Sequence, residues 1–314
     1  MNLYYFGTAL SLSALYMIAG CGSLFAIKSG EFNMGGEGQI YAGGFICAIF
    51  LNFAGKINLP AVFAVFLAIV AAFLISGFLA FLSSILKNYK NASPLFTTFI
   101  ISAAIIPLID GLIAGPFRTN EGNLLSTAFI NQNYRFFSIL PPSSCNATLF
   151  FAVFLCIALY FFFDRSSFGR KITIFGISPE FSKYSGYNNF LMRNFSLFIS
   201  GGLHGICGAV AVLGTYFTCH SGFYSGMGWN ALSASLIAGL NPVLLIPSSV
   251  VLAFIVTYAD KFALFNNLGF DISSLIQGII LFMIGFCLKG SAFSDFAKEI
   301  KTSSLKKRSQ GAQK

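Results

Sequence analysis

Two long stretches of the chain contain no charged residue, and they limit the fold more than any other feature. Residues 57–86 hold no Asp, Glu, Lys or Arg, and neither do residues 194–259, a run of 66 positions. About 20 apolar residues cross the core of a bilayer as a helix, so the longer run can hold two or three crossings. Only 9% of the residues are charged, against about 25% in soluble domains. The sequence therefore predicts a polytopic membrane protein.

The spanning segments are predicted to be helices. Lipid permits only helices and closed barrels, and barrel strands alternate apolar and polar residues. The run AVFAVFLAIVAAFLISGFLAFL (61–82) is apolar on all sides. The fold class is all-α, with about eight to ten spanning helices and nine as the best count. The sequence LNPVLLIP (240–247) leaves open a broken or re-entrant helix in place of two crossings. The expected spans are residues 4–27, 38–53, 60–86, 94–114, 147–164, 192–217, 229–240, 243–260 and 271–289.

Basic residues test this layout, because cytoplasmic loops carry an excess of Lys and Arg. Nine crossings with a cytoplasmic C-terminus and an outside N-terminus leave few of the 19 basic residues outside. The layout predicts a transmembrane domain over residues 1–290, with an external loop at 115–146 and a cytoplasmic loop at 165–191. A basic cytoplasmic tail follows at 291–314. The net charge of +9 then reflects orientation and requires no nucleic acid. The basic residues outside are Lys56, Arg118, Arg135 and Lys261.

Motifs of nucleotide binding and catalysis are absent from the sequence. It contains no GxxxxGK[ST] phosphate loop, no HExxH pair and no GxSxG elbow. His204 and His220 have no acidic or Cys residue at ligand spacing, and the seven scattered Cys form no CxxC pair. Neither a metal nor a cofactor is therefore expected. Asp110 is the clearest acid within a span, and its place near an outer helix end favours a solvated or capping role over proton relay.

The cytoplasmic loop contains the signals of a short helix. Ser178 suits the N-cap, Pro179 the first helical position and Glu180 the first turn. Gly186 suits the C-terminal stop. These residues predict a helix of about seven residues, Pro179–Ser185, on the cytoplasmic surface. An ordinary connecting loop is an equally good interpretation.

The span after this loop contains closely spaced glycines. Gly201, Gly205 and Gly208 occur within SGGLHGICGAVAVLG (200–214). Small residues at this spacing let two membrane helices approach closely. The sequence therefore predicts a tight helix contact along this span.

Four blocks of sequence carry a resemblance to a known family. They are NMGGEGQ (33–39), GISPEFSKYSG (176–186), SGGLHGICGA (200–209) and GMGWNAL (226–232). In this order they resemble the blocks N-I-G-x-E-G-Q, G-x-N-P-x-A-A-x-Y-A-G, S-G-x-x-A-G-x-x-G-A and G-x-G-x-x-A-I. These blocks are typical of permease subunits of ATP-binding-cassette (ABC) importers for branched-chain amino acids, simple sugars and nucleosides. The chain is most similar to the nucleoside-type, simple-sugar-like permeases.

The resemblance implies that the short helix is a coupling helix, which docks on a separate ABC ATPase subunit. ATP closes the ATPase pair, and the coupling helix then switches the membrane helices between inward and outward access. The chain itself would be a transport subunit and no enzyme. The residues that would make or flank the ATPase contact are Arg170, Lys171, Gly176, Ser178, Pro179, Glu180, Lys183, Tyr184 and Gly186.

Further partners and a location follow from the same resemblance. A second, homologous permease would complete a heterodimer around a central path, and an extracytoplasmic binding lipoprotein would deliver the solute. The chain would be multi-pass in the bacterial cytoplasmic (inner) membrane. Nucleosides are the favoured substrate, a riboflavin-like vitamin is second and simple sugars are third. The candidate path or gating residues are Asn33, Glu37, Gln39, Tyr41, Thr97, Thr98, Ser102, Tyr216, Trp229 and Asn230.

The polar segment GEFNMGGEGQIYAGGF (30–45) is expected to be a cytoplasmic turn that re-enters the membrane. Glu37 suits the first turn of the second span, where it would favour the helix dipole, and Asn33 suits a cap or turn. Together with Gln39, these residues are expected to be structural or gating residues before substrate ligands. Trp229 is expected near an outer helix end, as an interfacial anchor.

The chain departs from the family's blocks at three positions. Gly36 stands where a large apolar residue is usual, which is expected to loosen the start of the second span. Ser178 stands where Asn is usual. His204 stands where Ala is usual, and a local hydrogen bond is favoured for it over contact with a ligand.

Two other classes of protein stay open. An ion-coupled secondary transporter of a small polar solute would show charged residues within its spans, and this chain has almost none. A membrane scaffold or synthase subunit would not need the coupling block. Dependence of uptake on a proton gradient, or neighbouring genes for an ATPase and a binding lipoprotein, would separate these classes.

Overall fold

The computed structural model describes residues 3–119, 123–224 and 226–266, together with positions 275, 278–280 and 282–283. Within these residues, regular structure is helical, apart from two isolated β-bridges. A 3₁₀ turn occupies Gln132–Tyr134, and a π-helical turn, Val212–Tyr216, extends α8. The α-helices are α1 (Leu3–Lys28), α2 (Gly36–Lys56), α3 (Ala61–Lys90), α4 (Pro94–Ala114), α5 (Thr148–Arg165), α6 (Ser167–Ile177), α7 (Pro179–Tyr184), α8 (Asn189–Ala211), α9 (Met227–Ile237) and α10 (Leu245–Phe265).

Seven of the described helices are long and apolar enough to cross a bilayer: α1, α2, α3, α4, α5, α8 with its π-helical turn, and α10. The predicted all-α, polytopic membrane fold is therefore confirmed. The span expected at 229–240 differs, because α9 has 11 residues and rises only about 16 Å, half of a bilayer core. The span expected at 271–289 lies mostly outside the described residues, and the tail at 291–314 lies wholly outside them.

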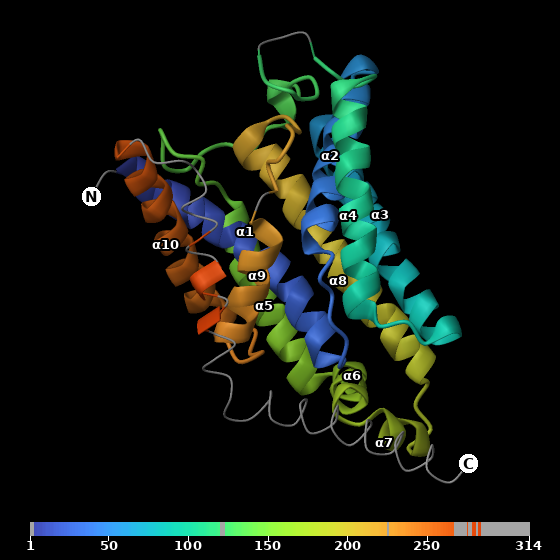
Figure 1. Ribbon diagram of the computed structural model, residues 1–314. Coiled ribbons are helices and arrows are strands. Elements are labelled where there is room, and N and C mark those ends of the chain that lie inside the picture. The colour runs from blue at the N-terminus through green and yellow to red at the C-terminus, as the bar shows by residue number, and fades with distance from the viewer. Residues whose placement is uncertain are drawn as a thin grey trace.

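Helices α1, α2 and α8 form the centre of the bundle, and α3, α4, α5 and α10 lie around them (Figure 1). Glycines permit this close packing. A Cβ atom on Gly208 would collide with the Ile40 carbonyl of α2, and one on Gly205 would collide with the Ala72 carbonyl of α3. A Cβ on Gly201 would lie 2.5 Å from the Ser76 carbonyl of α3. Close backbone contact supplies van der Waals attraction, which drives helix association in lipid.

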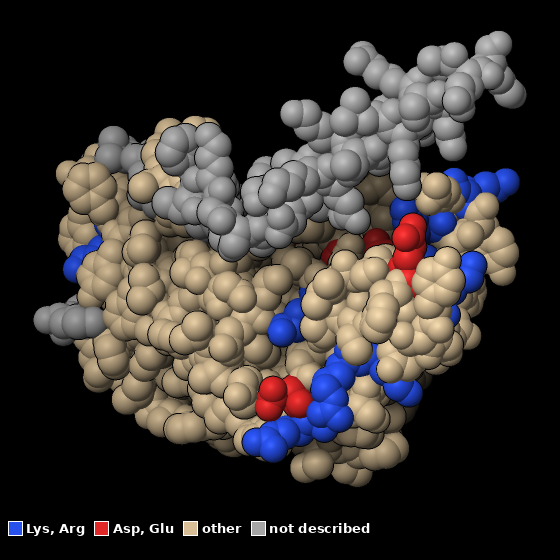
Figure 2. Space-filling view, turned by 90° about the horizontal axis from the view of Figure 1, so that it is seen from below, with Lys and Arg blue, Asp and Glu red and all other residues tan. Residues whose placement is uncertain are grey.

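Basic side chains group at one end of the bundle. Figure 2 shows Lys and Arg gathered on the face seen from below, the end that carries α6 and α7 in Figure 1. This is the asymmetry on which the predicted layout rests. The helices and loops that carry them place two sets of basic residues at opposite ends. Those at the lower end are Lys28, Lys87, Lys90, Arg165, Arg170, Lys171, Lys183 and Arg193, and those at the upper end are Lys56, Arg118, Arg135 and Lys261.

The upper end is covered by the segment between α4 and α5. Its backbone pairs with the chain after α8, through Thr127 N to the Cys219 carbonyl at 2.9 Å and Ile130 N to the Phe217 carbonyl at 2.9 Å. These bonds fix the loop that leads down to α9. The described residues of this predicted loop thus cover the upper end of the bundle.

Candidate functional site

The segment between α1 and α2 turns at Ser29 and Gly30, and residues 31–35 then run into the bundle without helical structure. Glu31 pairs with Arg193 near the start of α8, whereas Gln39 meets His204, eleven residues further along α8. Eleven helical residues rise about 16 Å, and the extended segment follows that rise in Figure 1. The predicted turn is thus limited to Ser29 and Gly30, and the residues after it are buried or half-buried inside the bundle. The side chains of Asn33 and its neighbours satisfy the backbone here, so the chain enters the bundle before a helix begins.

A buried polar network stands where this segment meets α8. The Asn33 and Gln39 side chains exchange two amide hydrogen bonds, of 2.8 and 3.0 Å, and Asn33 Nδ2 donates to Ser200 Oγ at 2.9 Å. His204 Nδ1 lies 2.9 Å from Gln39 Oε1, and its Nε2 lies 3.2 Å from Ser23 Oγ. Gln39 Oε1 only accepts, so Nδ1 carries the proton and Nε2 accepts from the Ser23 hydroxyl. The local hydrogen bonding favoured for His204 is what the structure shows.

Glu37 links the starts of two helices. It lies in the first turn of α2, and its Oε1 accepts from the backbone N–H groups of Gly228 at 2.8 Å and Trp229 at 3.3 Å, in the first turn of α9. The carboxylate therefore satisfies free N–H groups of α9 and faces the positive end of that helix. We call the residues Asn33, Glu37, Gln39, Ser200 and His204 the mid-bundle junction.

Helix α4 fixes the start of α2. Thr98 Oγ1 accepts from the Met34 N–H at 3.0 Å, and Ser102 Oγ accepts from the Gly38 N–H at 2.7 Å. Both donors belong to the entry into α2, where backbone N–H groups have no partner within the helix. Thr98 and Ser102 thus adjoin the junction. The Thr97 hydroxyl, by contrast, donates to the Ser93 and Pro94 carbonyls at the start of its own helix.

The remaining candidate path residues lie in two other places. Tyr41 donates to Asp110 Oδ1 at 2.6 Å, and Ser221 donates to the same oxygen at 2.7 Å. Asp110, half-buried near the upper end of α4, therefore joins α2 and α4 to the loop before α9. Tyr216 lies in the same upper region, with its ring 4.9 Å from that of His220.

Residues Trp229 and Asn230 lie in the first turn of the short helix α9, in the middle of the bundle (Figure 1). Asn230 Nδ2 donates to the Tyr16 hydroxyl at 2.9 Å. Trp229 borders a small pocket beside Asn33 and Glu37, of about 10 Å³, which is room for about one water molecule. The expected place of Trp229 at an outer helix end is wrong, because α9 begins at mid-depth.

Gly36 and His204, two departures from the family's blocks, are in contact. A Cβ atom on Gly36 would lie 3.3 Å from His204 Nε2 and 3.2 Å from the Gly228 Cα. The imidazole thus occupies the space into which a larger residue at position 36 would extend. Gly36 tightens the start of α2 and does not loosen it. The sequence signal of this contact is a pair of departures from the family's blocks: Gly36 is smaller than the usual residue, and His204 is larger than the usual Ala.

The lower end carries an elbow of two short helices, α6 and α7. The sequence predicts only the second, and α6 was missed because its glycines resemble a loop. Ser166 accepts from the Gly169 N–H at 2.9 Å to begin α6, and Ser178 accepts from the Phe181 N–H at 3.2 Å to begin α7. The signal for α6 is the spacing of its buried positions, Gly169, Ile172 and Phe175. Gly186, with φ of +77°, follows the end of α7.

The outer face of this elbow is apolar and aromatic. Ile177 is 79% exposed, Phe181 59% and Tyr184 90%, and Pro179, Glu180 and Lys183 are exposed beside them. Of the other candidate coupling residues, Arg170 donates to the Asp164 carbonyl at 3.1 Å, and the Lys171 ammonium lies 5.2 Å from the Tyr187 ring centre. Gly176 packs inward against Gly30.

The loops outside the spans contain buried titratable groups. Burial raises the pKa of the Cys145 thiol and raises that of Cys219 well above its usual range. Burial also lowers the pKa of His220. These thiols are therefore protonated and behave as small apolar groups. Among the described residues, no group of three or more His, Cys, Asp or Glu side chains stands ready to hold a metal ion.

A bundle of seven such apolar helices among the described residues defines the class of polytopic membrane proteins. The family described as branched-chain amino acid transport system / permease component matches residues 5–285. The chain belongs to this family: it is a permease subunit of an ABC importer and a multi-pass inner-membrane protein.

Individual relatives agree with the family. The chain is 32% identical over 272 residues to the probable riboflavin import permease protein RfuC of Treponema pallidum, covering 87% of this chain and 72% of that protein. It is 22% identical over 294 residues to the guanosine ABC transporter permease protein NupP of Bacillus subtilis, covering 90% and 81%. It is 22% identical over 283 residues to the glucose ABC transporter permease protein TsgB13 of Haloferax volcanii, covering 85% and 73%. No solved structure matches the chain.

Proposed function

We propose that this permease imports a flat heteroaromatic solute that carries a polyol or ribose chain, with riboflavin ahead of nucleosides. The observation that carries this order is the 32% identity to a probable riboflavin permease, against 22% to a guanosine permease. The sequence alone favoured nucleosides. The two solutes share a fused ring and a hydroxylated chain, so one path suits both chemistries.

The α6–α7 elbow is the element that couples this movement to ATP hydrolysis on a separate chain. In support, its outer face exposes Phe181 and Tyr184 beside Lys183, and aromatic residues are typical anchors of protein interfaces. The grouping of basic residues at the same end supports a cytoplasmic location for the elbow. The permease itself has no catalytic role in this proposal.

The mid-bundle junction serves as the gate of the path. Asn33, Glu37 and Gln39 join α2, α8 and α9 at one place, and movement of any one of these helices disturbs all three contacts. A second, homologous permease forms the other side of the path, and an extracytoplasmic binding lipoprotein delivers the solute.

Uptake by the whole complex tests the proposal. Proteoliposomes that contain the permease, its partner permease, the ATPase and the binding protein should take up labelled riboflavin when ATP is supplied on the ATPase side. Guanosine should compete more weakly and glucose least. Riboflavin uptake driven by a proton gradient in the absence of the ATPase would contradict the proposal, as would a clear preference for glucose.

Cross-linking tests the coupling assignment separately. A Lys183→Cys variant that carries a short photo-cross-linker should form an adduct with the ATPase. The matched control is Lys56→Cys at the upper end of the bundle, where no adduct is expected. Failure of the Lys183 position to reach the ATPase would remove the elbow from the coupling contact.

A further inference from the structure

Below the mid-bundle junction, Glu31 and Arg193 form an ion pair that the known role of a permease does not explain. We propose that this pair is the positioning device that transmits movement of the α6–α7 elbow to the junction, through the extended segment 31–35. The inference rests on the coupling role proposed above for α7. It concerns the path inside this chain, not the contact with the ATPase.

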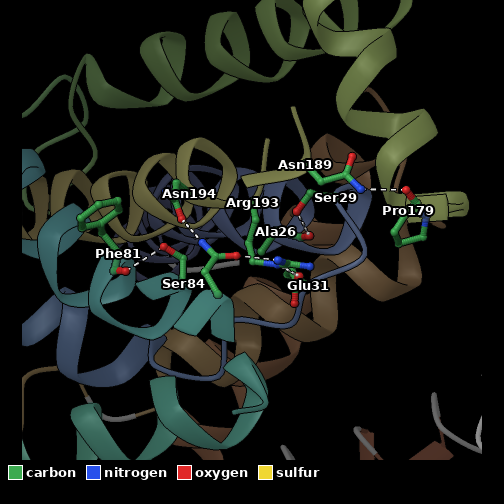
Figure 3. A network of polar contacts seen from close by, with 10 residues as sticks. Ala26, Ser29, Glu31, Phe81, Ser84, Pro179, Asn189, Arg193 and Asn194 are labelled. Carbon is green, nitrogen blue, oxygen red and sulfur yellow. Dashed lines mark hydrogen bonds and ion pairs between the residues drawn. The ribbon is translucent and has the colours of Figure 1, made fainter. Parts of the chain in front are cut away.

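The ion pair is largely shielded from solvent. Arg193 Nε donates to Glu31 Oε1 at 2.5 Å, and the two side chains are 17% and 9% exposed. Arg193 Nη1 also donates to Asn88 Oδ1 at 2.6 Å, and Asn88 Nδ2 donates to Asn194 Oδ1 at 2.7 Å (Figure 3). The pair thus joins the segment after α1 to α3 and α8. A buried charge that loses its partner is strongly unfavourable, so these parts move together.

The elbow contacts the segment between α1 and α2 at its lower end. A Cβ atom on Gly30 would lie 2.9 Å from the Gly176 carbonyl oxygen, so the end of α6 and the turn after α1 are in backbone contact. Phe175, one residue earlier in α6, is buried, and the Arg193 guanidinium lies 5.4 Å from its ring centre. Displacement of α6 therefore displaces both Gly30 and Arg193.

Helix α7 is tied to the start of α8. Asn189 Nδ2 donates to the Pro179 carbonyl at 2.7 Å (Figure 3), and Ser182 Oγ donates to Asn189 Oδ1 at 2.7 Å. Arg193 follows Asn189 by one helical turn. A push on α7 therefore reaches the ion pair by two routes, one through α6 and one through α8.

The extended segment passes the movement upward. Glu31 and Asn33 are buried, and Asn33 is bonded to Gln39 and Ser200. Hydrogen bonds from the Asn33 side chain and from the Met34 and Gly35 N–H groups hold this segment in place, so it has little slack to absorb a displacement. A shift of Glu31 therefore reaches Asn33, then Glu37, and through Glu37 the start of α9.

Space for such a movement lies on the other side of α6. A cleft of about 500 Å³ separates α6 from the turn between α9 and α10. Lys28, Arg170 and Asn241 are among its lining residues. The elbow is thus firmly packed towards the extended segment and open towards the cleft. It can move towards the cleft without compressing the core.

The experiment measures uptake and ATP hydrolysis in the same proteoliposomes. Glu31→Gln keeps the size of the side chain and removes its charge. ATP-driven uptake should fall at least about tenfold, while the assembled complex still hydrolyses ATP and Lys183→Cys still cross-links to the ATPase. The matched control is Asp164→Asn, which removes an exposed ion pair, Asp164–Arg165, whose side chains are 55% and 79% exposed. Its uptake should equal that of the wild type.

A second, more conservative variant separates loss of the ion pair from misfolding. Arg193→Lys keeps the charge opposite Glu31 but loses the second bond to Asn88, so uptake per assembled complex should be intermediate. Uptake by Glu31→Gln or Arg193→Lys equal to that of Asp164→Asn, with the Lys183 cross-link intact, would overturn the inference. Absence of that cross-link in the wild-type background would instead count against the proposed coupling role of α7.

Discussion

The elbow and the mid-bundle junction both depend on side-chain hydrogen bonds, but the bonds of the elbow are local in sequence and those of the junction are mostly long-range. The elbow is made by neighbours in sequence: Ser178 caps Phe181 three residues on, and Ser182 meets Asn189 seven residues on. The junction is made by residues far apart: Asn33 meets Ser200 at a separation of 167 residues, and Glu37 meets Gly228 at 191.

This difference shows how the two regions divide the work of a transporter. A local element such as the elbow keeps its shape when it shifts as a body. A junction of distant elements depends on the arrangement of the helices, so it changes when they move. Mutations should therefore have different effects in the two regions. Those at the junction should lower the stability of the permease, and those at the elbow should weaken binding of the ATPase.

Gly208→Val should have the largest effect on stability. Its side chain would enter the Ile40 backbone of α2, so α2 and α8 must separate at the level of the junction. Overpacking costs about 1–3 kcal/mol and occasionally more, and a backbone obstacle places this variant at the upper end. Thermal unfolding of the purified permease in detergent should show a large fall in Tm and little uptake.

A glycine without close neighbours provides the control for this variant. Gly111 lies within α4, and a Cβ atom at this position would have no neighbouring heavy atom within 4 Å. Gly111→Ala should leave stability unchanged or raise it by up to about 1 kcal/mol, because Gly is a poor helix former. Equal destabilisation by both variants would show that the glycine contacts of α8 do not hold the junction.

Glu37→Ala should have the next largest effect. It removes the acceptor of the Gly228 and Trp229 N–H groups, which are then buried without a partner, at a cost of about 1–3 kcal/mol. Glu37→Gln keeps an acceptor oxygen and should lose less stability. Thermal unfolding of the two variants measures the difference, and equal values for Ala and Gln would argue against the link between α2 and α9.

The difference between local and long-range contacts also explains which parts of the structure the sequence could predict. The span expected at 94–114 matches α4, because an apolar run and its breakers are local signals. The caps at Ser166 and Ser178 are also local, although only the second was recognised. The path of residues 31–35 into the bundle depends on contact with α8, and the start of α9 at mid-depth depends on contact with Glu37. No periodicity within either segment reports such contacts.

Ser178→Ala should have a smaller effect, confined to the elbow. An N-cap serine contributes about 1 kcal/mol to its helix, and α7 has only six residues. Amide hydrogen exchange should become faster at Phe181 and its neighbours, while the Tm of the bundle stays unchanged. A fall in Tm as large as that of Glu37→Ala would show that the elbow and the junction are one structural unit.

Tyr184→Ala should have the smallest effect on the permease itself. Its side chain is 90% exposed, and surface substitutions change stability by about 0.5 kcal/mol or less. Binding of the ATPase should nevertheless weaken by about tenfold or more, as is typical of an aromatic interface anchor. Glu180→Gln, an equally local change on the same helix, is the control for lost charge and should weaken binding less. Unchanged ATPase affinity in Tyr184→Ala would mean that the outer face of α7 is not the docking surface. A fall in Tm would mean that Tyr184 packs within the permease. The elbow would then contribute to the stability of the bundle, as the junction does, and the two regions would not differ in this respect.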